Sequence, residues 1–274
     1  DSMTRRNVAS WNAIISALAQ SGDGRDALTY YHKMLDEGIE PDPVTFASAI
    51  DACAGISSLE DGLKIHSSLV EYGFISNMIV VTALINMYGQ CGHLDIANGL
   101  FQVLPYHDVL SWSAMIAAYS RHGRGKEALL LFDKMLEGGF LPNEVTFVSV
   151  LSACSHAGLL EEGRKWWYAM RYDYGITPIP DHFDCMIDLY SRMGQLDEAE
   201  DLIKDMPIDP TAISWMTLLS ACRSKTDLSR GARAAKRMLD LDSSDPSPHP
   251  ILHNLYYINS SKEECDGNEN CLFT

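Results

Sequence analysis

The sequence has no long apolar run, no excess of basic residues and no recognisable targeting segment. Its longest mostly apolar stretch, Met78 to Tyr88, is far shorter than the ~18 residues that a membrane span needs, so we expect no membrane partner. Lys and Arg number 21 against 37 Asp and Glu, and this net charge of −16 disfavours a strong non-specific polyanion binder. The chain begins Asp1-Ser2-Met3, so we expect it to be a piece of a longer protein.

Core-forming residues, by contrast, are plentiful. With 46% hydrophobic and 21% charged residues over 274 positions, the composition is that of a folded protein, which excludes wholesale disorder. Seven cysteines are an odd number in a chain too long to need disulfides, and the spacing of Cys265 and Cys271 matches no zinc site. We predict that the other five are free thiols in helices, mostly buried as small apolar side chains: Cys53, Cys91, Cys154, Cys185 and Cys222.

Internal repeats dominate the sequence. The phrase Ser10-Trp11-Asn12-Ala13-Ile14-Ile15 returns 101 residues later as Ser111-Trp112-Ser113-Ala114-Met115-Ile116. A finer period lies inside this long one, because a small residue closes a recurring phrase at intervals of 35, 35, 31, 35, 36 and 32 residues. These small residues are Ala27, Gly62, Ala97, Ala128, Gly163, Ala199 and Gly231. The long period is therefore a triplet of unequal repeats.

Each repeat predicts two helices. Trp11, Ile14, Ile15 and Leu18 have the i, i+3, i+4, i+7 spacing of an amphipathic helix, and this stripe recurs in every repeat. A break such as Gly22 follows, and then a second helix, as in residues 26–37 and 126–137. We expect acidic residues in the first turn of the second helices, where they favour the helix dipole: Asp23, Glu60, Asp61, Asp95, Glu127, Glu161, Glu162, Asp197 and Glu198.

One helix pair cannot bury its own apolar stripe, whereas stacked neighbours can. We therefore predict an all-α fold, a right-handed superhelical solenoid of helix-turn-helix repeats with the first helices lining a concave face. The acidic second helices would lie away from that face, so the net charge says little about the groove.

Two positions vary between repeats while the stripe stays fixed. The residue after the first stripe residue lies about 100° around the helix, and we expect it to point out of the stack; it is Asn12, Ala47, Thr82, Ser113, Val148, Asp184 and Met216. The residue before each new repeat is Asp42, Asn77, Asp108, Asn143, Ile179 and Thr211. These residues are either helix caps and turn residues or a row of paired readers, one pair per repeat.

The phrases Val44-Thr45-Phe46 and Leu84-Ile85-Asn86-Met87-Tyr88-Gly89 resemble those of plant pentatricopeptide repeat (PPR) proteins of the PLS subclass, with P, long and short motifs. Residues 1–7 resemble the end of a preceding short repeat. The P, long and short repeats would be residues 8–42, 43–77 and 78–108, and again 109–143, 144–179 and 180–211. Residues 212–245 resemble an extension (E-like) motif, and we expect a degenerate or truncated tail at 246–274.

The resemblance implies binding of single-stranded RNA at one base per repeat. The fifth and last residues would hydrogen-bond the base edge, and the second residue would pack on its flat face. Carried over, the reading pairs are Asn12 with Asp42 for uridine, Thr82 with Asp108 for guanosine, and Ser113 with Asn143 for adenosine. The packing residues would be Ala9, Val44, Ile79, Leu110 and Val145.

The remaining repeats would read their bases weakly. Ala47, paired with Asn77, and Val148 offer no polar group at the fifth position, and Asp184 with Thr211 is a combination without an assigned base. The predicted preference, from 5′ to 3′, is U-n-G-A-n-n.

The resemblance also implies a role in organellar RNA processing in a mitochondrion or chloroplast, above all cytidine-to-uridine editing. A zinc deaminase needs His-x-Glu and Cys-x-x-Cys, and the chain contains neither. We therefore predict a non-catalytic specificity factor without cofactor or metal. Its expected partners are organellar RNA and an editing deaminase or accessory protein supplied in trans. We expect no DNA partner. The alternative, which the acidic balance favours, is a protein-binding helical-repeat scaffold.

Overall fold

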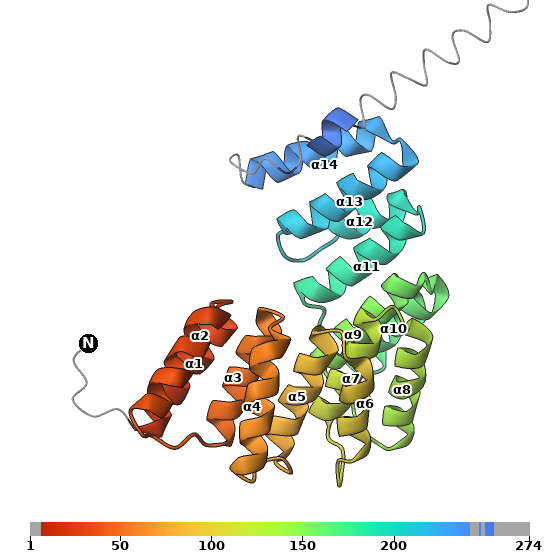
Figure 1. Ribbon diagram of the computed structural model, residues 1–274. Helices are drawn as coiled ribbons and strands as arrows, with labels where there is room; N and C mark the ends of the chain where they lie inside the picture. The colour runs from red at the N-terminus through yellow and green to blue at the C-terminus, as the bar shows by residue number, and fades with distance from the viewer. Residues whose placement is uncertain (1–6, 242–246, 248–249, 255–274) are drawn as a thin grey trace, which may run out of the picture. The chain divides into compact units, whose positions relative to one another are not determined.

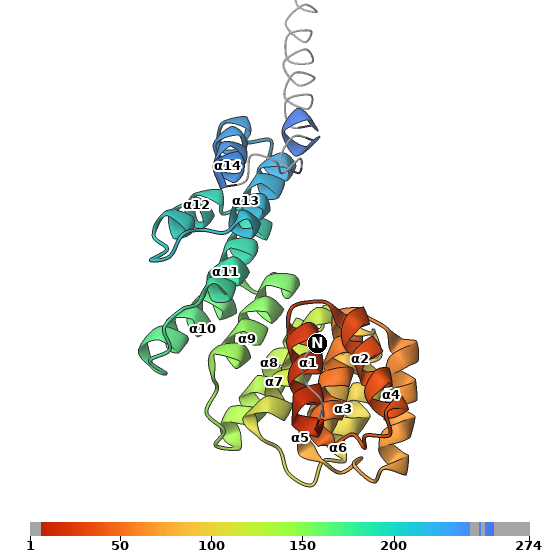
Figure 2. The same cartoon turned by 90° about the vertical axis from the view of Figure 1, so that its left-hand side faces the viewer.

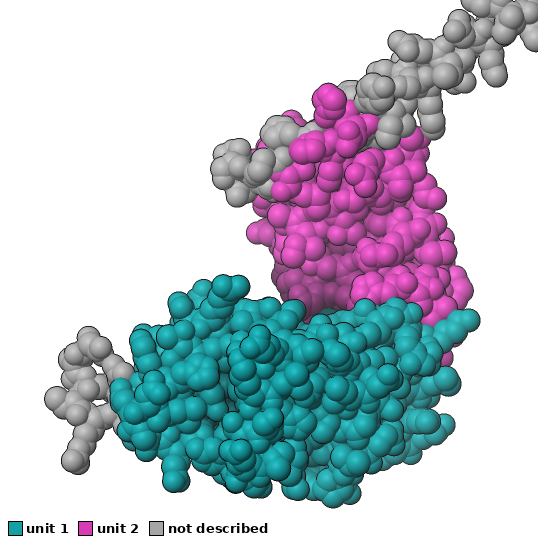
Figure 3. Space-filling model, viewed as in Figure 1, with its two compact units in different colours: residues 1–149 teal, residues 150–274 magenta. Residues whose placement is uncertain are grey.

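The computed structural model describes residues 7–241, 247 and 250–254. Within residues 7–241 the chain forms fourteen α-helices and no strand (Figure 1). The chain divides into two compact units, residues 1–149 and residues 150–274 (Figure 3). Most of the predicted tail, with Cys265 and Cys271, lies outside the described residues, as do residues 1–6 of the predicted preceding repeat.

The helices come in pairs. The first helix of each pair begins at the residue where a repeat was predicted to begin: α1 (Val8–Gln20), α3 (Pro43–Gly55), α5 (Met78–Gln90), α7 (Val109–Arg121), α9 (Glu144–Ala157), α11 (Pro180–Arg192) and α13 (Ala212–Lys225). The second helices are α2 (Gly24–Asp36), α4 (Leu59–Glu71), α6 (Leu94–Gln102), α8 (Gly125–Glu137), α10 (Leu160–Tyr172), α12 (Leu196–Lys204) and α14 (Leu228–Leu241). The predicted all-α fold of helix-turn-helix repeats is confirmed.

First helices pack side by side within each unit. In the first unit α1 contacts α3, α3 contacts α5, and α5 contacts α7, while in the second unit α11 contacts α13. Each of α2, α4 and α6 packs both on its own first helix and on the next one. Figure 2 looks at the first unit from the side of its first pair, α1 and α2. This packing of each repeat on its neighbour is what defines a solenoid.

The predicted apolar stripes form the core. The eighth residue of every repeat is fully buried, at 0% exposure: Ile15, Ile50, Ile85, Ile116, Leu151, Ile187 and Leu219. Burying one such side chain contributes about 1.5–3 kcal/mol. The recurring small residue marks the point where a second helix meets the next first helix, since a Cβ added to Gly62 would lie 2.8 Å from Sδ of Met87.

The short repeats are short because their second helices lose one turn. The helices α6 and α12 each have 9 residues, whereas α2, α4, α8 and α10 each have 13. Four residues are about one helical turn. In the first short repeat, the loop after α6 places His107 on Phe101, with the rings stacked at 4.2 Å, and beside Trp112 at 5.1 Å.

Two details differ from the sequence-based expectations. Asp23 is the N-cap residue of α2 and not part of its first turn, whereas the other predicted acids do lie in the first turns of their helices. Cys91 follows the last residue of α5 and, like Cys185, is only partly buried. The five described cysteines form no disulfide with one another, and burial raises the pKa of the Cys53, Cys154 and Cys222 thiols to about 12. These three thiols are therefore protonated at neutral pH.

Among the described residues, no helix combines the length and the apolarity that crossing a bilayer requires.

Two glycines of the first short repeat give opposite expectations for the same substitution. A Cβ at Gly89 would lie 2.7 Å from the Cβ of Ala118, and neither atom can move away by side-chain rotation, so Gly89→Ala would force α5 and α7 apart. We expect it to lower the free energy of unfolding by about 1–3 kcal/mol. Gly99, in α6, meets nothing within 4 Å, so Gly99→Ala should raise that free energy by about 0.5–1 kcal/mol. Urea unfolding of both variants measures the difference, and equal effects would contradict this account of α5–α7 packing.

Acidification should weaken the first short repeat. Burial lowers the pKa of His107, although Asp108 partly opposes this effect, and the Nδ1 atom of His107 is buried with no hydrogen-bond partner among the described residues. A histidine with a lowered folded-state pKa is protonated more readily when unfolded, so its contribution to stability is lost as the pH falls below about 6.5. The melting temperature should therefore fall less between pH 7.5 and 5.5 in His107→Phe than in the unsubstituted chain, and an unchanged slope would contradict this role.

Candidate nucleic-acid interface

The last residue of each predicted repeat caps the first helix of the next one. The Oδ1 atoms of Asp42, Asp108 and Asn143 accept hydrogen bonds of 2.8–3.0 Å from the backbone amide three residues later, at Thr45, Ser111 and Thr146. Asn77 accepts from the amides of Ile79 and Val80, and Thr211 from that of Ser214. The cap interpretation, left open by the sequence, is confirmed for these five residues. At Ile179, which has no polar side chain, the backbone amide donates instead to His182 Nδ1.

Capping occupies only one end of each side chain. All hydrogen bonds from the described residues to the side chains of Asp42 and Asp108 go to Oδ1, so Oδ2 stays available as an acceptor. Asn143 also uses Oδ1, and its Nδ2 amino group stays available as a donor. The same cap thus presents an acceptor where the residue is Asp and a donor where it is Asn.

The fifth residue is joined to this cap through a hydroxyl group. Thr146 Oγ1 bonds Ser113 Oγ at 2.7 Å and Asn143 Oδ1 at 2.9 Å. In the first repeat, Asn12 Nδ2 donates to Asp42 Oδ1 at 2.9 Å, and the Thr45 hydroxyl lies 2.5 Å from Asn12 Oδ1.

The second unit repeats the arrangement. The Ser214 hydroxyl donates to Asp184 Oδ1 at 2.5 Å and lies 3.2 Å from Thr211 Oγ1. The sequence-predicted pair of Asp184 and Thr211 is thus brought together through Ser214. Burial raises the pKa of Asp184, with the nearby Asp181 adding to the effect and the Ser214 hydrogen bond opposing it.

The expectation that fifth residues point out of the stack is wrong for three repeats. Asn12, Ala47 and Ser113 are all less than 10% exposed. First helices pack side by side, so a residue 100° from the core stripe faces the neighbouring helix and not solvent. Polar fifth residues are therefore held by neighbours and are not free side chains.

Thr82 is an exception among the polar fifth residues. The Ser111 hydroxyl, which would correspond to Thr45 and Thr146, bonds the backbone of Asp108 instead. Thr82 Oγ1 is left buried with no hydrogen-bond partner among the described residues. A buried hydroxyl without a partner costs free energy, and a bound ligand could satisfy it.

The second residues form an apolar row on the surface. Ala9 is exposed, and Val44, Ile79, Leu110 and Val145 are between 47% and 60% exposed. Apolar side chains that repeat on one exposed face mark a contact surface. Ile213, at the corresponding position of α13, is 64% exposed and was not among the predicted packing residues.

In the first unit, both rows line one hollow of about 430 Å³ across α3, α5, α7 and the start of α9. The fifth residues that line it are Ala47, Thr82, Ser113 and Val148, and the second residues are Ile79, Leu110 and Val145. Asp51, Asn86 and Arg121 also line it, and the sequence analysis did not identify them. Asp51 and Asn86 follow Ala47 and Thr82 by four residues, a helical spacing that places them on the same face.

Charge in this hollow is balanced. Its described lining residues carry one acid, Asp51, and one base, Arg121, despite the net charge of −16 of the whole chain. Asp42, in the first repeat, does not line this hollow. Burial acts to raise its pKa, but hydrogen bonds from the Thr45 amide and the Asn12 side chain outweigh this effect and lower the pKa below its usual value. Asp42 is thus ionised at neutral pH.

Removing the Asp42 cap should weaken the first unit. We expect Asp42→Ala to lower the free energy of unfolding by about 1 kcal/mol. Because its folded-state pKa is lowered, the contribution of Asp42 is present above about pH 4 and is lost as the pH falls through the folded-state value. Asp36→Ala, at the exposed end of α2, removes the same charge and should not destabilise the chain. Urea unfolding at pH 7 compares the two, and equal losses would rule out a specific cap.

Sequence models of the family match much of the chain. The model described as PPR repeat family matches residues 6–55 and 107–156, and the one described as PPR repeat matches residues 79–107, 145–173 and 181–209. Together these segments cover more than half of the chain. No prediction of the P, long and short types, or of the E-like motif, is tested by them.

Curated relatives come from Arabidopsis thaliana. The pentatricopeptide repeat-containing protein CRR2, chloroplastic, is 39% identical over 256 residues, which are 93% of this chain and 39% of that protein. A mitochondrial pentatricopeptide repeat-containing protein is 38% identical over 262 residues, 96% of this chain and 41% of that protein. The chain thus spans about two fifths of the length of these relatives.

Solved structures share the fold. The pentatricopeptide repeat protein PPR10 of maize, in complex with an 18-nucleotide psaJ RNA element, matches with a TM-score of 0.68 at 18% identity, over 93% of this chain and 38% of that chain. A tetratricopeptide repeat protein from Parabacteroides merdae matches with a TM-score of 0.60 at 16% identity, over 91% of this chain and 98% of that one. The fold is therefore that of both repeat classes, and the sequence matches distinguish them: the chain belongs to the pentatricopeptide repeat family.

Proposed function

We propose that this chain binds single-stranded RNA in a sequence-specific manner, one base per repeat, as a non-catalytic specificity factor for organellar RNA processing. The observation that supports this most directly is the hollow of the first unit, where fifth residues and exposed apolar second residues line one surface. Bases could pack between neighbouring apolar residues, with their edges toward the fifth and last residues.

The capped last residues supply a chemical basis for base choice. Asp42 and Asp108 present a free acceptor, which suits the N3–H of uridine and the N1–H of guanosine. Asn143 presents a free donor, which suits the N1 acceptor of adenosine. With Thr82 Oγ1 unpartnered at the third repeat, these groups support the order U-n-G-A for residues 8–143.

The acidic balance does not argue against this function. The acids of the second helices lie in first turns such as those of α4 and α8, and none of them lines the hollow. Salt-dependent attraction by many cations would be absent, so we expect affinity to depend on base contacts more than on phosphate contacts.

The proposed role in organellar RNA processing concerns the whole protein, of which this chain is a part. Two second helices of 13 residues followed by one of 9 residues, an order that occurs twice, support the assignment of P, long and short repeats. Relatives named chloroplastic and mitochondrial support an organelle as the location. We assign the chain to cytidine-to-uridine editing on its resemblance to the PLS subclass, with the deaminase supplied in trans.

Exchanging the last residues should exchange the preferred bases. Asp108→Asn keeps the Oδ1 cap of α7 and replaces only the free acceptor by a donor, so the preference at the third base should change from guanosine to adenosine. Asn143→Asp makes the reverse change at α9, and the fourth base should change from adenosine to guanosine. Each exchange should be worth roughly tenfold in affinity. Binding of both variants to RNAs with U-n-G-A, U-n-A-A and U-n-G-G measures this.

Asp36→Asn is the control for the change in net charge, since Asp36 is the exposed last residue of α2. Its RNA preferences should equal those of the unsubstituted chain. If the two exchanges alter affinity without altering base preference, reading by the last residue is wrong. If no RNA binds at low salt, the protein-binding scaffold becomes the better explanation of the groove.

A further inference from the structure

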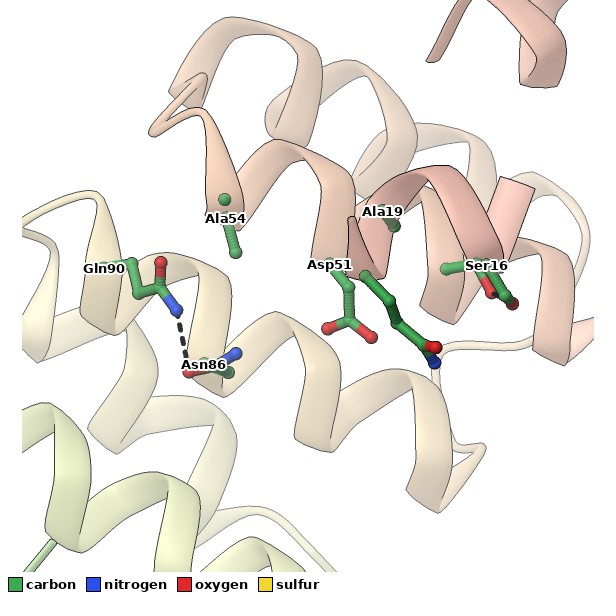
Figure 4. Close-up of a pocket in the computed structure, with 9 residues that line it drawn as sticks. Ser16, Ala19, Asp51, Ala54, Asn86 and Gln90 are labelled. Carbon is green, nitrogen blue, oxygen red and sulfur yellow. Dashed lines mark hydrogen bonds between the residues drawn. The ribbon is translucent and has the colours of Figure 1, made fainter. Parts of the chain in front are cut away.

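Asp51 is a carboxylate without a partner on the inner side of the first unit. It lines the hollow of the fifth residues and also a second hollow of about 360 Å³ between α1, α3 and α5. Figure 4 shows its carboxylate pointing into the space between α3 and α5, with Asn86 and Gln90 on the α5 side. It takes part in no hydrogen bond or ion pair with the described residues. Asp188, at the same position of the last short repeat, is instead paired with Arg192 at 2.7 Å.

In the second hollow, the polar groups around Asp51 are uncharged. Ser16 and Gln20 of α1 and Asn86 and Gln90 of α5 face the second hollow, and Asp51 is its only charged residue among those described. The Asp51 side chain is exposed, yet three helices surround it, and the partial loss of water around the carboxylate raises its pKa to about 6. At neutral pH the carboxylate is therefore mostly ionised, and none of the described donors forms a hydrogen bond with it.

Neighbouring hydrogen bonds fix the orientation of Asn86. Arg121, which has only donors, approaches Asn86 Oδ1 at 3.3 Å, and the Gln90 amide donates to the same oxygen at 3.4 Å. With Oδ1 engaged from the α7 side, the Asn86 Nδ2 donors are left for other partners. The two hollows thus share a pair of acceptors at Asp51 and a pair of donors at Asn86.

One base complements that pattern. The Watson–Crick edge of guanine carries two adjacent donors, N1–H and the 2-amino group, followed by the O6 acceptor. A carboxylate can accept both donors, as Asp and Glu do from other paired donors, and an amide nitrogen can donate to O6. Cytosine and adenine offer one amino donor each, and uracil flanks its single donor with two acceptors that a carboxylate repels.

The long repeat that contains Asp51 otherwise lacks a polar reader. Its fifth residue, Ala47, is small and buried and makes no side-chain hydrogen bond, and Asp51 lies one turn further along the same face of α3. A base above Ala47 would be flanked by the exposed second residues Val44 and Ile79, of which Ile79 lines the same hollow as Asp51.

We propose that Asp51 and Asn86 form a guanine-reading subsite, so that the repeat at residues 43–77 selects guanosine as the second base and the preferred sequence becomes U-G-G-A. This inference rests on the RNA binding proposed above. In it Asp51 accepts from N1–H and the 2-amino group, Asn86 donates to O6, and Arg121 positions Asn86.

The test is binding of the 274-residue chain to RNAs that differ only at the second base: U-G-G-A, U-A-G-A, U-C-G-A, U-U-G-A and the inosine form of the first. We expect guanosine to bind roughly tenfold more tightly than uridine. Inosine, which lacks only the 2-amino group, should fall between them. Asp51→Asn keeps the shape of the side chain and leaves no partner unsatisfied, so it should fold normally, and its preference for guanosine over uridine should fall below about twofold.

Two control variants distinguish base reading by Asp51 from a general effect of its negative charge. Asp36→Asn removes the same charge from an outer helix and should keep the guanosine preference. Asp108→Asn should redirect the third base and leave the second unchanged. If Asp51→Asn strengthens binding of all five RNAs equally, Asp51 only repels phosphate and the subsite is wrong.

A further outcome distinguishes this inference from the function on which it rests. If the third base is discriminated and the second is not, the guanine subsite is wrong and repeat-by-repeat RNA binding stands. If no RNA binds but an arginine-rich peptide binds and loses affinity in Asp51→Asn, both are overturned and the hollow is a protein-docking site.

Discussion

The hydrogen bond from the third backbone amide of a first helix to the side chain just before that helix links the folding of each repeat to the recognition proposed for it. It satisfies a donor that the helix terminus would otherwise leave unpaired. It also fixes the side chains of Asp42, Asp108 and Asn143 by one atom, so that the other atom has a defined direction. A base-reading group held in this way loses little conformational entropy on binding. One residue per repeat therefore ends one structural unit and, in the proposed function, also presents the chemical group that distinguishes bases.

Stacking of the first helices places these caps at regular intervals. Because first helices pack on one another, the polar fifth residues Asn12, Ser113 and Asp184 are joined by hydrogen bonds to the cap of the next first helix. Variation in repeat length does not disturb this arrangement, since the short repeats lose a turn from their second helices and keep 13-residue first helices. Repeat length is thus adjusted on the second helices, none of which contributes a described residue to the hollow.

Much of the fold could be predicted from the residues alone. The spacing of Trp11, Ile15 and Leu18 and of their equivalents predicted the first helices, and the buried eighth residues confirm that these stripes form the core. The recurring small residues, Gly62 among them, revealed the repeat period, and the close approach of Met87 explains why the residue at Gly62 is small. The direction of the fifth residues could not be predicted in the same way. One helix drawn by itself places Asn12 outside the stripe, and only the neighbouring α3 buries it against Asp42 and Thr45.

The sequence by itself determined the repeat register, the helix pairs and the family, because apolar periodicity and recurring phrases are local properties of the chain. It also supplied the proposed reading positions, although only through resemblance to that family. Tertiary structure alone decided which atoms those residues present. Cap geometry leaves one free atom on Asp108 and Asn143. The Ser111 hydroxyl bonds the backbone of Asp108, which leaves Thr82 without a partner among the described residues. Packing of α3 against α1 and α5 also brings Asp51 and Asn86 to the same hollow, across 35 residues of sequence. Such contacts depend on distances between helices, which no periodicity in the sequence encodes.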